Sequence, residues 1–267
     1  MSWRVVAAKD FRDGLRSRSV VAVTLVFVVS FAGAAYLYGY LAEVNPSMES
    51  STTAFAGLMS GTASFYTTSL VSLMGLMLGY SAVVGERDSG SLKLLLGLPH
   101  SRRDAVFGKA VGRGVVLVGS VLAGVVAASL VSLTYEETSA VALAWLGLGT
   151  AVLGLAHLSV GLGLSAALNS QSRVTAAVVG YFLANKFLWD SGLLPRLVVY
   201  PWGDGLLDTP DWYPYLESLA PNTAFQTVID GGLNGFDGVG GVALAALAFW
   251  VVAPVSLGYL AFERSDV

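Results

Sequence analysis

Long uncharged apolar runs are the feature that most constrains how this chain can fold. The first extends from Val20 to Leu41 and holds no charged residue. About 20 predominantly apolar residues in a helix are enough to cross a bilayer, and similar runs recur along the whole sequence. Only 12% of the 267 residues are charged, against about 25% in an average soluble domain. We therefore expect an all-α, polytopic membrane protein.

The apolar runs predict six transmembrane helices that form a single domain over residues 1–267. Length alone would allow two domains, but the runs fill so much of the chain that one helical bundle is the simpler arrangement. A long segment at 190–240 holds five of the eight prolines and is expected to lie on the outer side. The six spans are expected at about 20–41, 64–84, 106–133, 140–168, 174–188 and 242–262.

Residues 1–18 are expected to form an amphipathic helix that lies on the membrane surface. Trp3, Ala7, Phe11 and Leu15 are spaced four apart, which places them on one helical face. The alternative is the basic segment of a signal peptide. The following run at 20–41 argues against it, because signal peptides carry only about 7–15 apolar residues there.

The basic residues predict the orientation of the chain in a plasma membrane. With a cytoplasmic N-terminus, six spans put 13 of the 15 Lys and Arg residues on the cytoplasmic side, as the positive-inside rule requires. Both termini are then cytoplasmic. Lys109 and Arg113, at the start of the third span, are expected to reach the lipid headgroups as anchors. Lys186 and Arg196 fall toward the outside.

Sequence motifs for catalysis are missing, so we expect no enzyme. A phosphate-binding loop needs Gly-Lys followed by Ser or Thr, whereas Gly108-Lys109 is followed by Ala110. The two histidines, His100 and His157, stand 57 positions apart, and the chain has no cysteine. We therefore expect no metal site and no cofactor bound by this chain.

A few polar residues fall inside the predicted spans. His157 lies in the middle of the fourth, where an ionisable group suggests a substrate contact or a proton site. A neutral imidazole bonded to a serine or a carbonyl is the favoured alternative. Thr67 and Ser69 belong to a hydroxyl-rich stretch that could line a polar path, although hydrogen bonds between helices explain it equally well. Lys186 must reach outward or pair with an acid such as Asp190.

The loop after the second predicted span, residues 86–104, is the most informative segment. It begins with charged residues, continues through a helix-breaking Ser89-Gly90 into an apolar run of leucines, and ends in Pro99 and a basic stretch. We expect a short helix that lies crosswise at the cytoplasmic surface and ends at Pro99. Its leucines need a partner groove.

These residues resemble the permease subunits of ABC-2 type transporters, in particular the branch that includes the nitrous oxide reductase copper-maturation permease. Three weaker likenesses lie in the stretch from Lys9 to Arg18, where Asp10 replaces the usual Glu, in Ser218 to Phe225, and in the terminal F-E-R-S-D-V. The loop motif is the most specific, and its matching residues are Glu86, Arg87, Gly90, Ser91, Leu92, Leu95, Leu96, Pro99, Ser101, Arg102, Gly108 and Lys109.

The resemblance implies a six-span half-transporter, an exporter that pairs with a second copy or a homologue and with separate ABC ATP-binding subunits. ATP and Mg would be bound by those subunits, and the permease would contact lipid but no nucleic acid. The N-terminal helix would be the elbow helix and the loop the coupling helix that docks on the ATPase. The docking residues would be Glu86, Arg87, Gly90, Leu92, Leu95, Leu96, Pro99 and Arg102.

Two rival functions remain at this point. A secondary transporter would show paired ionisable residues at the middle of the membrane and often an internal repeat. Only His157 and Lys186 approach the first requirement. A non-transporting membrane scaffold is the second rival.

Overall fold

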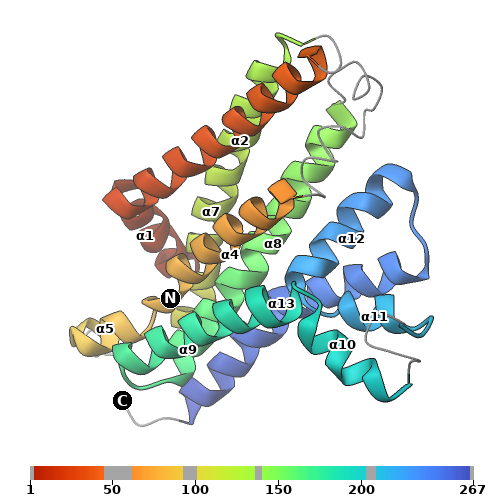
Figure 1. Cartoon of the computed structure of the whole chain (residues 1–267). Coiled ribbons are helices and arrows are strands. Elements are labelled where there is room, and N and C mark those ends of the chain that lie inside the picture. Colours follow the sequence, from red (N-terminus) through yellow and green to blue (C-terminus); the bar gives the residue numbers. More distant parts are fainter. Residues whose placement is uncertain (1–2, 45–61, 93–100, 136–139, 203–208, 265–267) are drawn as a thin grey trace.

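The computed structural model describes residues 3–44, 62–92, 101–135, 140–202 and 209–264. Every regular element in these ranges is helical. The long helices form an elongated bundle, and the N- and C-terminal ends of the chain lie at the same end of it (Figure 1). We call this the terminal end.

The chain begins with α1 (Trp3–Arg16) and, after a break at Ser17, continues into α2 (Arg18–Val44), which leaves at a different angle (Figure 1). The buried side of α1 consists of Val6, Ala7 and Asp10, which pack against α7. That this helix lies on a membrane surface stays a prediction. Ala7 is buried, but Trp3 and Leu15 are 42% and 57% exposed, because α1 turns its smaller residues toward its neighbour.

Four long helices form the centre of the bundle: α4 (Thr62–Tyr80), α7 (Arg102–Ser132), α8 (Ala140–Ala167) and α13 (Gly238–Glu263). The helix α8 packs against the other three, and α2 packs against α7. Glycines allow the closest approaches. A Cβ at Gly75 of α4 would stand 2.5 Å from the Gly154 carbonyl oxygen of α8, so a side chain there would force the two helices apart.

Five helical stretches within the described residues are long and apolar enough to cross a membrane. They lie at Val20–Leu41, Thr68–Asp88, Arg102–Ser132, Leu143–Ala167 and Gly238–Glu263. The predicted fifth span at 174–188 is built differently. There, α9 (Gln171–Leu183) of 13 residues runs directly into the six-residue π-helix η2 (Ala184–Trp189). Neither segment would cross a bilayer alone, so a total of six spans stays a prediction.

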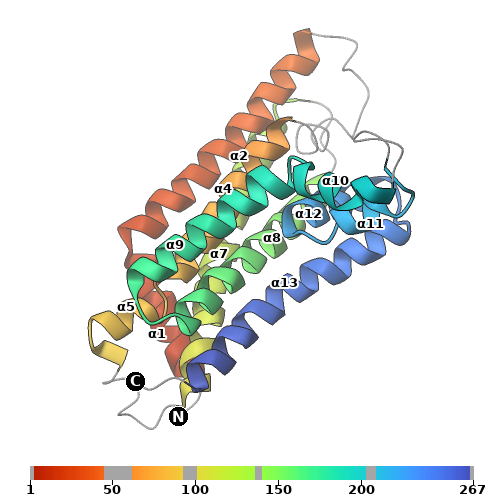
Figure 2. The same cartoon turned by 60° about the horizontal axis from the view of Figure 1, so that its bottom comes forward.

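The outer segment expected at 190–240 contains several short helices. They are α10 (Leu193–Val199), the 3₁₀ turn η3 (Tyr200–Trp202), α11 (Tyr213–Glu217) and α12 (Pro221–Asn234). They gather beside the part of α13 that is far from the terminal end (Figure 2). The helix α12 packs against α8 and α13, and its residues Phe225 and Ile229 join the main apolar core.

Candidate functional site

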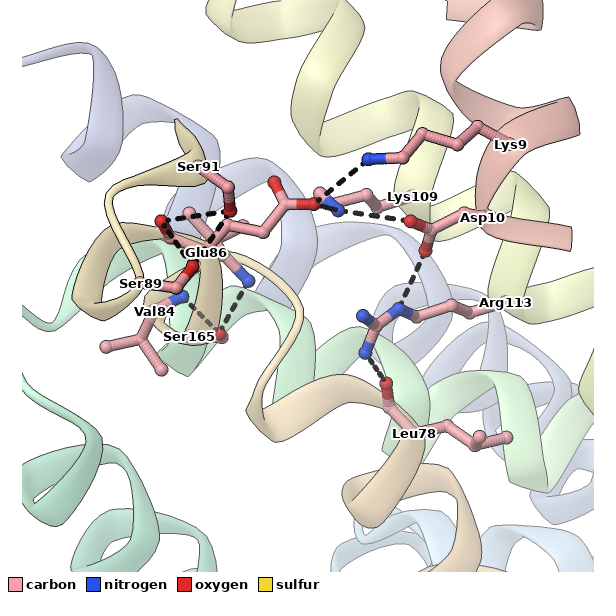
Figure 3. Close-up of polar contacts among 11 residues, drawn as sticks. Lys9, Asp10, Leu78, Val84, Glu86, Ser89, Ser91, Lys109, Arg113 and Ser165 are labelled. Atoms are coloured by element: carbon pink, nitrogen blue, oxygen red, sulfur yellow. Dashed lines mark hydrogen bonds and ion pairs between the residues drawn. The ribbon is translucent and has the colours of Figure 1, made fainter. Parts of the chain in front are cut away.

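A cluster of charged side chains joins three helices at the terminal end of the bundle (Figure 3). Lys109 of α7 donates to the Asp10 carboxylate at 3.1 Å and to the Glu86 carboxylate at 2.7 Å. Arg113, one turn further along α7, donates from Nε to the other Asp10 oxygen at 2.8 Å. Lys9 stands 3.7 Å from Glu86. Lys109 therefore links α1 to α5 (Val84–Asp88), the helix on which Glu86 lies.

The cluster lies mostly out of solvent. The Lys109 side chain is only 2% exposed, and those of Asp10 and Glu86 are 8% and 19% exposed. Burial by itself would raise the pKa of Asp10, but the positive charges of Lys109 and Arg113 and their hydrogen bonds outweigh it, so its pKa lies below the ordinary value. Asp10 is consequently ionised at neutral pH, and its charge is matched inside the cluster.

The position of Glu86 depends on a break between α4 and α5. The chain turns after Tyr80, and the Ser165 hydroxyl of α8 accepts the backbone N–H groups of Val83 and Val84 at 3.0 and 3.1 Å. A helix start leaves such N–H groups without intrahelical partners. Gly90 then adopts a φ of +74°, in the left-handed region that favours glycine. The predicted helix break at Ser89-Gly90 is thus confirmed.

Two arginines connect the same region to other helix ends. The Arg87 guanidinium donates to the Leu168 carbonyl at 3.3 Å and to the Asn169 side chain, in the turn between α8 and α9. Arg102 donates to the Phe262 and Glu263 carbonyls at 2.7 and 3.0 Å. These carbonyls end α13, where a cation is favoured by the helix dipole. The loop at 86–104 is therefore attached to the bundle near both of its ends.

A second polar network lies toward the opposite end of the bundle. Lys186 of η2 donates to Thr68 of α4 at 2.6 Å and pairs with Asp190 at 3.0 Å. The Asn222 amide donates to Asp190 at 2.8 Å and to Asn185 at 2.9 Å. Its carbonyl oxygen accepts the Ser72 hydroxyl of α4 at 3.0 Å. Asn222 thus joins α12, η2 and α4, and the predicted pairing of Lys186 with Asp190 is confirmed.

Comparison with known proteins identifies the family. The model of the ABC-2 family transporter protein matches residues 4–267. The chain belongs to the ABC-2 family. The probable ABC transporter permease protein NosY of Stutzerimonas stutzeri is 31% identical over 260 residues, covering 96% of this chain and 89% of its own length. The protein of the same description from Pseudomonas aeruginosa is 30% identical over 282 residues, covering 98% of each.

The family assignment settles the coarse function. As an ABC-2 protein, the chain is a multi-pass membrane protein and a permease subunit, which is a transport component rather than a catalyst. The resemblance that the loop motif indicated is therefore confirmed.

The described residues of the loop motif make contacts within the chain, and their docking role stays a prediction. Leu92 is completely buried and packs with Val106 and Phe262, so it contributes to the packing of the chain itself. Glu86 and Arg102 likewise bond inside the chain. Gly90 is exposed. The remaining predicted docking residues, Leu95, Leu96 and Pro99, lie outside the described residues.

The anchor role expected for Lys109 and Arg113 is wrong. Lys109 is 1% exposed, and Arg113 donates to Asp10 and to the Leu78 carbonyl of α4. Both side chains turn into the protein because Asp10, on the facing surface of α1, offers a carboxylate at that depth. Spacing within α7 alone could not reveal this partner, which comes from 99 residues earlier.

His157 bonds to a backbone carbonyl, as the second of its two interpretations predicts. Its Nδ1 lies 3.0 Å from the Leu153 carbonyl oxygen of its own helix, and its ring is completely buried beside Tyr181. Ser69 is half-buried on α4. Thr67 also lies on α4, but its side chain is outside the described set. A polar path through Thr67, Ser69 and His157 therefore stays a prediction.

Sequence reasoning did not single out Asp10 or Asn222 as site residues. Each nevertheless belongs to a quoted stretch of family resemblance, Lys9 to Arg18 and Ser218 to Phe225. Their positions within these two stretches are the sequence signal that points to them. The hydrogen-bond partners of the two residues could not be predicted, because they lie on helices distant in sequence.

Proposed function

We propose that this permease subunit works in an exporter driven by separate ATP-binding subunits that dock on the loop at 86–104. Its membership of the ABC-2 family and its permease relatives support this reading. ATP and Mg would be bound by the partner subunits. A second permease, either a copy or a homologue, would complete the complex in a plasma membrane.

The observation that carries the proposal is the attachment of the loop to the bundle. Its first residue, Glu86, is bonded to Lys109 and through it to α1. Arg102, near its last residue, is bonded to the end of α13. A movement of the loop would therefore be transmitted to α1, α7 and α13 through these direct contacts. Coupling of this kind needs a packed element with two arrangements.

The terminal end is the cytoplasmic end in this proposal. It carries the basic residues of α1, the loop and the turn after α8, which the positive-inside rule assigns to the cytoplasm. The network around Asn222 then lies toward the outside, where it holds α12 against α4 and η2. Opening of the pathway toward the outside would require these hydrogen bonds to separate.

The docking proposal can be tested by co-purification. The chain is co-expressed with a candidate ABC ATP-binding protein from the same genome, and the ATPase that remains on the tagged permease is quantified. Leu95→Glu with Leu96→Glu should abolish its retention, because charged side chains would replace the apolar contacts of the dock. The matched control is Ser170→Glu with Ser172→Glu, which adds the same charge at the start of α9, where Ser170 is half-buried and Ser172 is exposed.

Equal retention of the ATPase by both double variants would overturn the docking site. Membrane insertion and detergent-solubilised yield are measured in parallel, because a variant that fails to insert reports on folding. The permease assignment itself rests on the family and would survive such a result.

A secondary transporter remains the second candidate because of one observation. Lys186 and Asp190 form an ion pair whose side chains are 2% and 8% exposed, and paired ionisable residues within a membrane often mark ion-coupled transport. The two candidates differ in their energy source. Movement of substrate that follows an ion gradient in vesicles without ATP would favour this second function.

A further inference from the structure

A groove of about 520 Å³ lies between α7, α8 and α13. This volume is within the roughly 300–1,000 Å³ of typical ligand pockets. On its α7 wall, Val111, Val115 and Leu122 are 43–53% exposed, so the groove opens to the outside of the bundle. In a membrane that surface faces either lipid or another protein.

The groove exists because α7 lacks side chains at two places along this wall. Gly114 and Gly119 both line it. A Cβ built on Gly119 meets nothing within 4 Å, whereas one on Gly114 would stand 3.1 Å from Leu155. Space for an added side chain is therefore open at Gly119 and nearly filled at Gly114.

The lining offers little to a polar ligand. Ser159 is the one lining residue with a polar side chain among those described, and its hydroxyl accepts the Val255 backbone N–H at 3.0 Å. The other lining residues are Ala, Val, Leu and Gly. An apolar chain fits this surface, since it requires no hydrogen bonds from the protein.

A cation stands where the groove approaches the terminal end. Arg103, Phe107 and Val111 are four residues apart on α7, and the Arg103 guanidinium lies 5.9 Å from the centre of the Phe107 ring. The Phe107 ring in turn lies 5.7 Å from that of Tyr259 on α13. Arg103 is exposed and forms no ion pair with any described residue.

Other charges at this end are compatible with an anion. Arg264 follows α13 and is exposed. Glu263 accepts the Tyr259 hydroxyl at 3.0 Å, so one of its oxygens already has a partner. Basic sites beside transmembrane helices at the cytoplasmic side commonly bind the headgroups of anionic lipids.

We propose that the groove binds one acyl chain of an anionic phospholipid whose phosphate is held by Arg103. The apolar groove and the cation occur on one face of α7, in the order that a lipid with its headgroup at the terminal end requires. The orientation is that of the proposed function. The apolar lining and the nearby cation together favour a lipid. The alternative occupant is a second copy of this chain.

The test measures phospholipid retained by the purified permease in mild detergent, using native mass spectrometry and lipid extraction. Gly119→Leu adds a side chain to the groove wall at a position where its Cβ meets no protein atom within 4 Å, and it should reduce bound phospholipid at least about tenfold, since several methylene groups lose their site. Gly33→Leu is the matched control, because a Cβ at that exposed position of α2 also meets nothing within 4 Å. It should retain the wild-type amount.

Arg103→Gln tests the headgroup separately. Bound lipid should persist, but its preference for phosphatidylglycerol over phosphatidylcholine should disappear. Phosphatidylglycerol with a photoreactive acyl chain should label the peptide that contains residues 110–122 in the wild type and much less in Gly119→Leu. Equal labelling of the two proteins would overturn the site.

The rival occupant has its own outcome. A photoreactive amino acid placed at position 119 would cross-link to lipid if the proposal holds. Cross-linking to another copy of the permease would assign the groove to a protein interface and overturn the lipid site. Neither result would bear on the docking of ATP-binding subunits, because the co-purification test concerns the loop at 86–104.

Discussion

Lys109 illustrates how a charged residue can be accommodated inside a membrane protein. Its Nζ lies within 3.1 Å of two carboxylates, one from α1 and one from α5. A buried charge is costly unless it is paired and hydrogen-bonded, and here two helices supply the pairing. The residue therefore stabilises one arrangement of α1, α5 and α7 over others that would leave a charge alone.

Lys109→Met should destabilise the permease by about 3 kcal/mol, which is the lower end of the range for breaking a buried ion pair. The lower end applies because Asp10 would still be paired with Arg113, and Glu86 with Lys9. Thermal unfolding in detergent with dye or tryptophan fluorescence measures the change. Lys9→Met is the control. Its side chain is 55% exposed, and an exposed ion pair contributes only about 0–1 kcal/mol. A similar loss in both variants would contradict a special role for Lys109.

The cluster also predicts a dependence on acid. The pKa of Asp10 is lower in the folded protein than its ordinary value of 3.8. Folding therefore favours the ionised form of Asp10. The resulting contribution to folding stability is fully present well above pH 3.8 and is lost as the pH falls through the pKa of the folded protein. The stability difference between wild type and Asp10→Asn should be largest near neutral pH and should shrink below about pH 3.8. A difference that grows in acid would contradict the prediction.

Close helix contacts determine the arrangement at the scale of elements. At Gly161 of α8, a Cβ would stand 2.7 Å from the Leu76 carbonyl oxygen of α4. Backbone atoms cannot move aside locally, so a methyl group there must separate the two helices. Glycine is unfavourable for helix formation by about 1 kcal/mol relative to alanine, and the contact explains why it is nevertheless accommodated.

Gly161→Ala should lower the thermal stability and the yield of folded permease, despite the gain in helix propensity. Gly180→Ala provides the comparison. It is also a helical glycine, but a Cβ there meets nothing within 4 Å, so the variant should be neutral or slightly stabilised. Size-exclusion profiles and unfolding temperatures in detergent measure both. Equal behaviour would mean that α4 and α8 are not packed as closely as the structure indicates.

At the scale of the whole molecule, two polar groups of residues occupy the two ends of the bundle. The charged cluster around Lys109 lies at the terminal end, and the network around Asn222 lies far from it. Between them the core is apolar, with Phe27, Leu117 and Leu153 among its residues. Relative motion of α4 against α7 and α12 would therefore break the hydrogen bonds of the Leu78 carbonyl and the Ser72 hydroxyl in these two groups.

Asn222→Ala should shift the population toward a state in which α12 has moved away from α4. Distances between spin labels at Asn234→Cys on α12 and the exposed Met77→Cys on α4 report this movement, and the absence of native cysteines leaves the background clean. In the control with the same two labels, Thr134→Ala removes an exposed hydrogen bond, that from the Thr134 hydroxyl to the Val131 carbonyl. A distance distribution unchanged by Asn222→Ala would exclude a gating role for the network.

The sequence by itself determined the membrane class, the approximate place of most long helices and the family. These follow from local properties: the length of the apolar runs, the charge bias and a short motif at Glu86 to Arg102. The tertiary structure decided which side chains meet. From the sequence Lys109 is expected to anchor in lipid headgroups, whereas in the structure it is buried by partners from other helices. Helix rotation and packing set such contacts, and periodicity along one helix carries no record of the helix that will face it.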